Sequence, residues 1–361
     1  MPLTEIIDSQ MPSMTEWLEK IGVKNAADFR AEDNSKRDRL EILFGEIGLP
    51  YTRPEKLEAL DIANQTPKFL KILQDKGDKK CALRLMPKKD NLPKLRVRGK
   101  TLKENLVWYH AQAINPADYL VEIVPHEQNI YSAIFIINDR SVWGEIIPGG
   151  HWKLTQGFHE NELMVFLYQS GKWRWQGNDD LEAKKIIEQA VLSLKVYPEK
   201  QNILKQKLSA QFTAEGYLKG YFEFTVLPEV GTQFIDYNRL LVNLASPILS
   251  TEKPPVSELS GICASPGQAR GIAKIVLDPK TAEFNAGEIL VCPMTMVDYI
   301  PLMQKSAGII TEQGNLLSHA AIISRELKKP CLIGVKQATK KIKNGQTIQL
   351  NADAGTIQII T

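Results

Sequence analysis

Three features of the 361-residue sequence predict a mixed fold, α+β or α/β, in two domains. Residues 1–80 and 180–194 carry apolar side chains at helical spacing, and short apolar runs between 81 and 237 predict strands. Residues 247–260 are rich in Pro, Ser and Glu and lack periodicity, which predicts a linker. We therefore expect an N-terminal domain over 1–250, with a helical part at 1–80, and a compact second domain over 261–361.

The individual elements follow from local patterns. Leu40, Leu43 and Ile47 predict a helix that Gly48-Leu49-Pro50 ends, and Leu181, Ile187 and Leu194 predict one apolar helix face. Asn138-Asp139 is a plausible hairpin turn between two strands. The expected strands of the first domain are 81–86, 95–97, 119–124, 131–138, 142–147, 221–226 and 232–237.

The composition argues against several protein classes. Apolar residues make up 43% and charged residues 24%, as in an ordinary globular protein rather than a disordered chain or a coiled coil. The net charge is only +3, and it lies in residues 251–361, which hold 12 Lys and Arg against 9 Asp and Glu. So small a charge gives no argument for nucleic acid or an anionic membrane as a partner.

Cysteine usage and the N-terminus indicate the cellular compartment. Cys81, Cys263, Cys292 and Cys331 form no C-x-x-C pair, so neither a zinc site nor a redox pair is predicted. The sequence opens without a signal-peptide pattern, and no apolar run approaches the ~20 residues of a membrane span. We expect a soluble cytoplasmic protein and make no prediction of its oligomeric state.

Residues 307–335 are the most informative segment. Ala307–Thr311 predicts a buried strand, and Ser318 is a candidate N-cap for a helix from His319 to Lys328. His319 then lies in the first helical turn, where free N–H groups and the helix dipole favour an anion, and its imidazole is a competent nucleophile. Arg325 is a possible charge partner. The alternative is a histidine that only caps or packs, which an isolated histidine at a helix start would favour.

The surrounding residues decide between these readings, because the segment resembles the phosphohistidine swivelling domain of PEP-utilising enzymes. This family includes PEP synthase, pyruvate phosphate dikinase and rifampin phosphotransferase. The resemblance extends over 261–361 and implies that His319 carries the phosphoryl group and that Thr311 helps to orient it. Asn315 departs from the pattern, which usually has a glycine there. The matching positions are Thr311, Gly314, Ser318, His319, Ala320, Ala321, Ile322, Arg325, Glu326, Leu327, Pro330 and Gly334.

A second group of polar residues lies on two expected strands. Glu223 falls on the first strand, and Asp236 and Asn238, two residues apart, share one face of the second. Oxygen ligands from neighbouring strands suit Mg²⁺, which itself binds nucleotide phosphates. The alternative is a hairpin with solvated polar residues, and from these residues alone the two are equally supported.

This arrangement resembles an ATP-grasp-like fold of the dikinase branch, followed over residues 35–240. The resemblance implies ATP and Mg²⁺ as cofactors, with Glu223, Asp236 and Asn238 on the metal and Lys36 and Arg84 on phosphates. It also implies that Glu122 lies on the strand behind adenine and that Glu145 belongs to a nucleotide-site loop. Leu85-Met86 replace the usual serines, and Asp236 and Asn238 replace Gln and Arg. His110, His126, His151 and His159 show no metal-ligand spacing and are expected to be structural or surface residues.

These observations lead to a main hypothesis and two alternatives. We expect an ATP-dependent dikinase-type phosphotransferase that moves a phosphoryl group from ATP through His319 to an acceptor. No segment resembles a PEP or pyruvate barrel, so we expect the acceptor to be a separate protein or a small molecule. The alternatives are an ATP-dependent condensation or ligation enzyme using the same relay, and a degenerate protein that senses nucleotide without turnover.

Overall fold

The computed structural model describes residues 21–22, 26–89, 92–125, 128–156, 162–244 and 259–360. Within these ranges the side chains of residues 26, 155, 156, 243, 244 and 319 are not described. The chain forms two compact units, Met1–Met11 with Tyr51–Gln128, and Pro12–Pro50 with Asn129–Thr361. Both mix helices and strands, so the predicted mixed fold is confirmed. No helix in the described ranges is long and apolar enough to cross a membrane.

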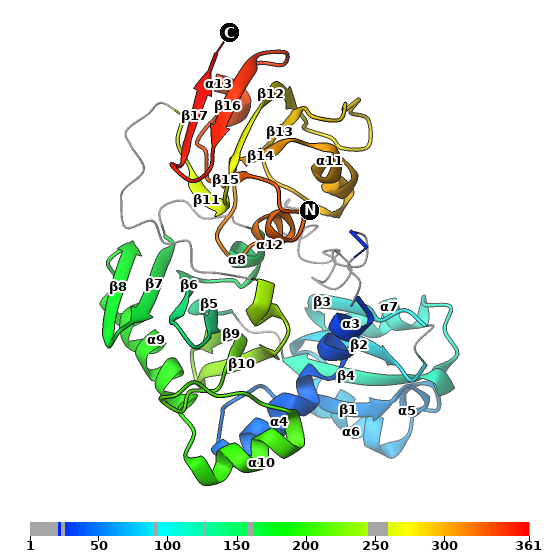
Figure 1. The fold of residues 1–361 in the computed structure, drawn as a ribbon. Coiled ribbons are helices and arrows are strands. Elements are labelled where there is room, and N and C mark those ends of the chain that lie inside the picture. The colour runs from blue at the N-terminus through cyan, green and yellow to red at the C-terminus, as the bar shows by residue number, and fades with distance from the viewer. Residues whose placement is uncertain are drawn as a thin grey trace. The chain divides into compact units, whose positions relative to one another are not determined.

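The unit containing Tyr51–Gln128 is built on a four-stranded sheet of order β1-β4-β2-β3 (Figure 1). Leu83, Leu85, Val121 and Ile123 are buried in its apolar core. Helix α7 begins with a capping box in which Thr101 and Glu104 each satisfy a backbone N–H of the first turn. The elements are β1 (Glu55–Glu58), α5 (Ala59–Ala63), α6 (Pro67–Lys76), β2 (Lys80–Pro87), β3 (Leu95–Thr101), α7 (Leu102–His110), η1 (Pro116–Asp118) and β4 (Tyr119–Pro125).

The other unit contains a six-stranded antiparallel sheet of order β10-β9-β5-β6-β7-β8. One of its faces carries an aromatic core in which Phe135 stacks on Phe222, and Phe222 stacks on Tyr237. The strands are β5 (Tyr131–Ile137), β6 (Val142–Pro148), β7 (Met164–Gln169), β8 (Lys172–Gly177), β9 (Gly220–Leu227) and β10 (Gly231–Asn238). The helices around it are α3 (Ala26–Asn34), α4 (Lys36–Ile47), α8 (Trp152–Gln156), α9 (Leu181–Ser193), α10 (Pro198–Leu208) and η2 (Leu241–Leu244).

A buried charge network fixes α3 and α4 to strand β10. The Arg39 guanidinium donates to the Tyr237 carbonyl from Nε at 3.0 Å and to the Glu32 carbonyl from a terminal nitrogen at 2.6 Å. The Glu32 carboxylate accepts from the backbone N–H of Arg239 at 2.7 Å and from its Nε at 2.9 Å. Because a buried charge is tolerated only when it is paired, this network holds α4, and with it Lys36, in one position beside the sheet.

The same unit also contains a seven-stranded sheet of order β11-β15-β14-β13-β12-β16-β17, in which β12, β13, β14 and β15 are parallel (Figure 1). Its core includes Ile289, Val291, Ile310 and Leu332. The strands are β11 (Ile262–Ser265), β12 (Gln268–Ile275), β13 (Ile289–Cys292), β14 (Gly308–Thr311), β15 (Cys331–Ile333), β16 (Thr347–Asn351) and β17 (Thr356–Ile359). The helices are η3 (Val297–Tyr299), α11 (Ile300–Lys305), α12 (His319–Glu326) and α13 (Ala338–Lys341).

The strands expected from the sequence are all present, and the helix expected over 180–194 is α9. Gly48 ends α4 in the left-handed conformation, as its position predicted. Residues 1–80 were expected to be helical, but they also contain strand β1; helices α7 and α10 were not predicted either. The expected linker 247–260 lies outside the described residues except for Leu259 and Ser260, so it stays a prediction.

Gly144 lies where strand β6 closely approaches β5. A Cβ atom added there would meet the Ile134 carbonyl oxygen and the Phe135 Cβ, each at 2.3 Å. We expect Gly144→Ala to lower the free energy of unfolding by about 1–3 kcal/mol, because the sheet must open to admit the methyl group. Urea denaturation followed by circular dichroism measures this change.

Gly45→Ala is the matched control for the fold prediction. Gly45 lies in helix α4, and a Cβ atom there would have no neighbour within 4 Å. We expect this variant to be stabilised by about 0.5–1 kcal/mol, because alanine is the better helix former. Equal unfolding midpoints for the two variants would contradict the packing assigned to Gly144.

Candidate functional site

A row of residues on one face of the six-stranded sheet forms the centre of the candidate site. Asp236 on β10 is directly opposite Glu223 on β9, Glu223 is opposite Ile134 on β5, and Ile134 is opposite Glu145 on β6. Directly opposite residues point to the same face of a sheet, so all four side chains share it. We call Asp236, Glu223, Ile134 and Glu145 the polar row. The sequence predicted Glu223 and Asp236 on neighbouring strands, but placing Glu145 in the same row required the strand order.

Glu223 is held by two neighbours. The His151 Nε2 atom lies 3.0 Å from one carboxylate oxygen, and the Tyr221 hydroxyl donates to the other at 2.5 Å. Burial alone would raise the pKa of Glu223, but the attraction and hydrogen bond of His151 lower it to about 2. Glu223 is therefore a stable anion at neutral pH.

Asp236 is the second carboxylate of the row, and Lys36 is its cation. The Lys36 Nζ atom lies 3.3 Å from Asp236 Oδ2 and 2.9 Å from Asp33 Oδ1. Burial raises the pKa of Asp236, with a further contribution from Glu223, and Lys36 opposes this rise. Asp236 Oδ1 is buried and has no hydrogen-bond partner among the described residues, so it is an acceptor that an added ligand could use.

The structure gives Asn238 a backbone role. Its Oδ1 accepts the backbone N–H groups of Leu240 and Leu241, each at 2.9 Å. This oxygen therefore caps the short helix η2, and both of its lone pairs are used within the chain. The prediction that Asn238 is a metal ligand finds no support in this geometry.

Arg84 and Glu122 lie together in the other unit, on neighbouring strands. They are directly opposite in the register of β2 and β4, and the Arg84 guanidinium lies 3.9 Å from the Glu122 carboxylate. The structure therefore pairs these two predicted nucleotide-site residues with each other. Lys36, Glu145, Glu223 and Asp236 all belong to the unit of the polar row.

The segment around His319 has the predicted architecture. Strand β14 ends at Thr311, whose hydroxyl donates to the Gln313 carbonyl at 2.6 Å and shapes residues 312–318, which we call the histidine loop. Gly314 has a φ of +144°, a conformation that favours glycine. Ser318 caps helix α12, its hydroxyl oxygen accepting the Ala321 N–H at 3.4 Å, and His319 is the first helical residue. The described part of His319 is its backbone only.

Glu145 binds the histidine loop. Its carboxylate accepts the backbone N–H of Leu316 at 2.7 Å and that of Leu317 at 3.3 Å. Glu145 is fully buried, and this burial raises its pKa to about 7, although the two N–H groups and Arg325 favour the anion. Both carboxylate oxygens are bonded to the loop, a partner that the resemblance to a nucleotide-site loop did not indicate.

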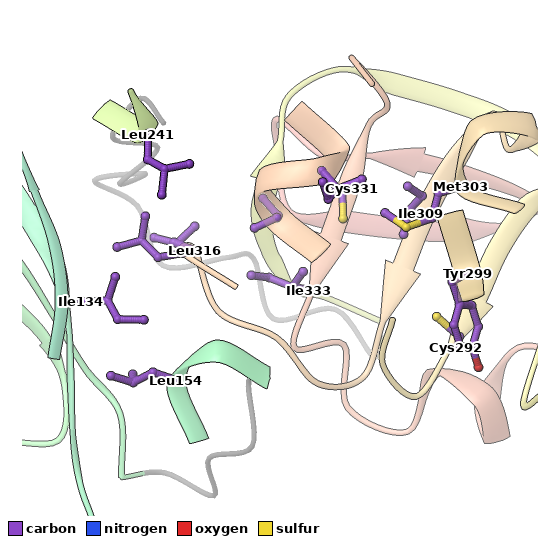
Figure 2. Packing of buried hydrophobic residues seen from close by; sticks show 14 of the residues in the cluster. Ile134, Leu154, Leu241, Cys292, Tyr299, Met303, Ile309, Leu316, Cys331 and Ile333 are labelled. Carbon is purple, nitrogen blue, oxygen red and sulfur yellow. The ribbon is translucent and has the colours of Figure 1, made fainter. Parts of the chain in front are cut away.

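Asn315 makes a second contact between the loop and the six-stranded part of the unit. Its Nδ2 donates to the Leu154 carbonyl at 2.7 Å, and the side chain is fully buried. Figure 2 shows Leu316 beside Ile134, Leu154 and Leu241, which belong to the same buried apolar cluster. The departure from the glycine pattern at 315 therefore supplies a hydrogen bond that glycine could not make.

Arg325, a predicted charge partner, is a buried cation on α12. All three guanidinium nitrogens are buried and have no hydrogen-bond partner among the described residues. Burial lowers the pKa of Arg325 to about 10, against the opposing attraction of Glu145. Arg325 thus adds positive charge to the helix that begins at His319.

Sequence reasoning missed His151 and Tyr221, the two residues that hold Glu223. His151 follows β6 and was expected to be structural or on the surface, because its spacing to the other histidines carries no signal. The signal available for Tyr221 was its position two residues before Glu223, on the same strand face. No group of three or more His, Cys, Asp and Glu side chains suited to a metal occurs within the described residues.

His151→Asn tests the ion pair with Glu223. The pKa of Glu223 is lowered to about 2 in the folded chain from an ordinary value of 4.5. The stabilisation that Glu223 gives the fold is therefore fully present above pH 4.5, the ordinary pKa that applies in the unfolded chain. It is lost as the pH falls toward 2. We expect the variant to lose on the order of 2 kcal/mol of unfolding free energy at pH 6, with the deficit shrinking by pH 3. His110→Asn, at an exposed position, is the control, and equal losses in both variants would contradict the pair.

Comparison with known proteins identifies a domain family in the C-terminal part of the chain. Residues 284–355 match the PEP-utilising enzyme mobile domain. The chain is 43% identical over 100 residues to a probable phosphoenolpyruvate synthase of Staphylothermus marinus, covering 27% of this chain and 12% of the relative. It is 39% identical over 107 residues to a rifampicin phosphotransferase of Streptomyces sviceus, covering 30% and 12%.

A solved structure overlaps a larger share of the chain at low similarity. The phosphoribosylamine–glycine ligase of Thermotoga maritima covers 56% of this chain and 47% of its own, with a TM-score of 0.31 and 11% identity. The match to the two sequence relatives, the synthase and the rifampicin phosphotransferase, spans about an eighth of the length of each. Its C-terminal part contains a mobile domain of the PEP-utilising enzymes, as the sequence predicted.

Proposed function

We propose that this chain is an ATP-dependent phosphotransferase of the dikinase type, with His319 as the phosphoryl carrier. The observation that carries the proposal is the position of the histidine loop. The loop is bonded to Glu145 in the same polar row that contains Glu223 and Asp236. Neighbouring strands lie about 4.8 Å apart, so the loop contact is roughly 10 Å from Glu223.

Lys36 beside the row, together with a divalent cation on its carboxylates, would suit a nucleoside triphosphate. Lys36 lies beside Asp236 and would neutralise phosphate oxygens as a point charge. In the proposed step, an imidazole nitrogen of His319 attacks the β-phosphorus of ATP. A P–N bond forms as the bond to the α-phosphate oxygen breaks, and AMP leaves, so that His319 carries the β- and γ-phosphates. Attack of water or inorganic phosphate on the γ-phosphorus then breaks the β–γ bridge and leaves the β-phosphoryl group on His319. Fixed cations stabilise such transfers because the protein contributes mainly positioning and electrostatics.

The donor set of the row fits a magnesium ion. Mg²⁺ prefers one or two carboxylates together with substrate phosphates, and Glu223 and Asp236 are carboxylates on adjacent strands. Within the part of the chain that the structure describes, the buried Asp236 Oδ1 has no hydrogen-bond partner, as expected of an oxygen that binds a ligand. Glu223 and Asp236 would hold the ion, which supplies positive charge to the phosphates when bound. Asn238 is left out, because its oxygen caps η2.

The acceptor and the compartment are further parts of the proposal. The relatives named as phosphoenolpyruvate synthase and rifampicin phosphotransferase match over the mobile domain. They therefore support the carrier step more than any one acceptor, and we keep a small molecule and a separate protein as acceptor classes. All four cysteines are free and buried, which supports a reducing cytoplasmic location.

Labelling tests the carrier. The chain is incubated with Mg²⁺ and with ATP labelled at the β- or the γ-phosphorus, and the protein-bound label is then tested for acid and base stability. We expect acid-labile, base-stable label, because a P–N bond hydrolyses in acid. The label should be absent in His319→Ala and unchanged in His110→Ala, which removes an exposed histidine of helix α7.

The outcomes separate the three hypotheses. Label that persists in His319→Ala, or no label from either nucleotide, contradicts an autonomous transfer from ATP. Nucleotide binding without label favours a sensing protein. AMP and phosphate formed together with a new covalent bond in a product favour a ligation or condensation enzyme.

Lys36→Met and Asp236→Asn test the nucleotide end of the site. Each removes a charge of the row, so we expect the rate of His319 labelling to fall by roughly 10²-fold or more, as for loss of one preorganised electrostatic group. Lys207→Met is the matched control, because Lys207 pairs with Glu46 at an exposed position on α10. Equal labelling rates in Lys36→Met and Lys207→Met would contradict the assignment.

A further inference from the structure

We propose that Glu145 is a positioning residue that docks the histidine loop on the six-stranded sheet, and that breaking its two hydrogen bonds frees the mobile domain to leave. The link to phosphoryl transfer rests on the proposed function, but the docking itself does not. Glu145 is 171 residues from Leu316 in sequence, so this contact joins two distant parts of the chain.

The burial of Glu145 needs a partner that the sheet does not supply. Its neighbours across the strands are Ile134 and Val165, both apolar and buried. An isolated carboxylate in such surroundings is very unfavourable, and hydrogen bonds to the anion are what make it tolerable. The Leu316 and Leu317 N–H groups fill this role in the docked state.

The loop is held along three consecutive residues. Asn315 bonds the Leu154 carbonyl, and Leu316 and Leu317 bond Glu145. His319 follows two residues later, within roughly 7 Å of chain from Leu317. Because the loop is fixed so close to His319, the docking also fixes where helix α12 begins relative to the polar row.

The groups facing Glu145 make the docking sensitive to protons. The Arg325 guanidinium on α12 attracts the Glu145 carboxylate. The negative charge of Glu145 contributes to raising the pKa of Tyr221 on β9. The pKa of Glu145 is raised to about 7 in the docked state, from an ordinary value of 4.5. The docked state therefore binds the proton more tightly. Docking is favoured at low pH and loses stability as the pH rises from about 4.5 to about 7.

Amide hydrogen exchange of the full chain without nucleotide tests the docking. In Glu145→Ala, which removes both acceptor oxygens, we expect the exchange of the Leu316 and Leu317 amides to rise at least tenfold, with the Ile309 and Ile310 amides of β14 unchanged. Asn315→Ala leaves the carboxylate in place and should speed the same two amides by a smaller factor. Asp353→Asn is the control, because it removes a carboxylate that accepts the Gly267 N–H in the same sheet region, away from the loop.

The pH profile separates positioning from a merely structural role. In the wild type, exchange of the two amides should rise between pH 5 and 7 more steeply than base catalysis alone predicts, and in Glu145→Gln the extra steepness should vanish. The docking is overturned if both amides exchange at wild-type rates in Glu145→Ala, or if Asn315→Ala leaves them unchanged. It is also overturned if the wild-type profile shows no extra steepness.

The labelling rate connects the docking to the reaction. We expect Glu145→Gln to lower the rate of His319 labelling at saturating ATP while the KM for ATP stays within about twofold, because Glu145 positions the loop and does not bind nucleotide. A raised KM for ATP with an unchanged labelling rate would indicate that Glu145 binds nucleotide and does not position the loop. If the wild type takes no label, the proposed function fails, whereas the exchange result still decides the docking.

Discussion

The cost of burying charge governs this unit of the chain. Glu32, Arg39, Glu145, Glu223 and Asp236 are buried or nearly so, and burial of an unpaired ion is far more costly than one hydrogen bond repays. Arg39 forms an ion pair with Glu32 and donates a hydrogen bond to the Tyr237 carbonyl of β10. These contacts position α4. Among the described residues, the hydrogen bonds to the Glu145 carboxylate come from the histidine loop. Two parts of the unit that are remote in sequence are thus joined by the requirement that a carboxylate keep its partners.

The antiparallel register of the six-stranded sheet places the residues of the candidate site on one face. A row across β10, β9, β5 and β6 gives one sheet face two carboxylates at one end and the loop contact at the other, separated by Ile134. The opposite face carries buried aromatic rings, among them Phe135, Phe222 and Tyr237. Lys36, His151 and the histidine loop contact the row on its own face.

Patterns of local origin were predictable from the sequence, and contacts of distant origin were not. Short apolar runs predicted β5, β6, β9 and β10, and Ser318 predicted the start of α12, because these features depend on neighbours in the chain. The partners of Glu145, His151 and Asn315 depend on strand order and on the docking of the loop, which periodicity does not encode. Asn238 had the right spacing for a metal ligand, but its oxygen is used by the turn that follows β10.

The central claim is that the carboxylate pair and His319 serve one site. Nuclear magnetic resonance of the full chain with ¹³C-labelled histidine tests it most directly, with the His319 signal assigned from its loss in His319→Ala and with Mn²⁺ replacing Mg²⁺ beside a non-hydrolysable ATP analogue. We expect bound Mn²⁺ to broaden the His319 signal strongly and to leave the His110 signal sharp, and we expect Asp236→Asn to remove the broadening. A His319 signal that stays sharp at saturating Mn²⁺ and analogue would contradict it.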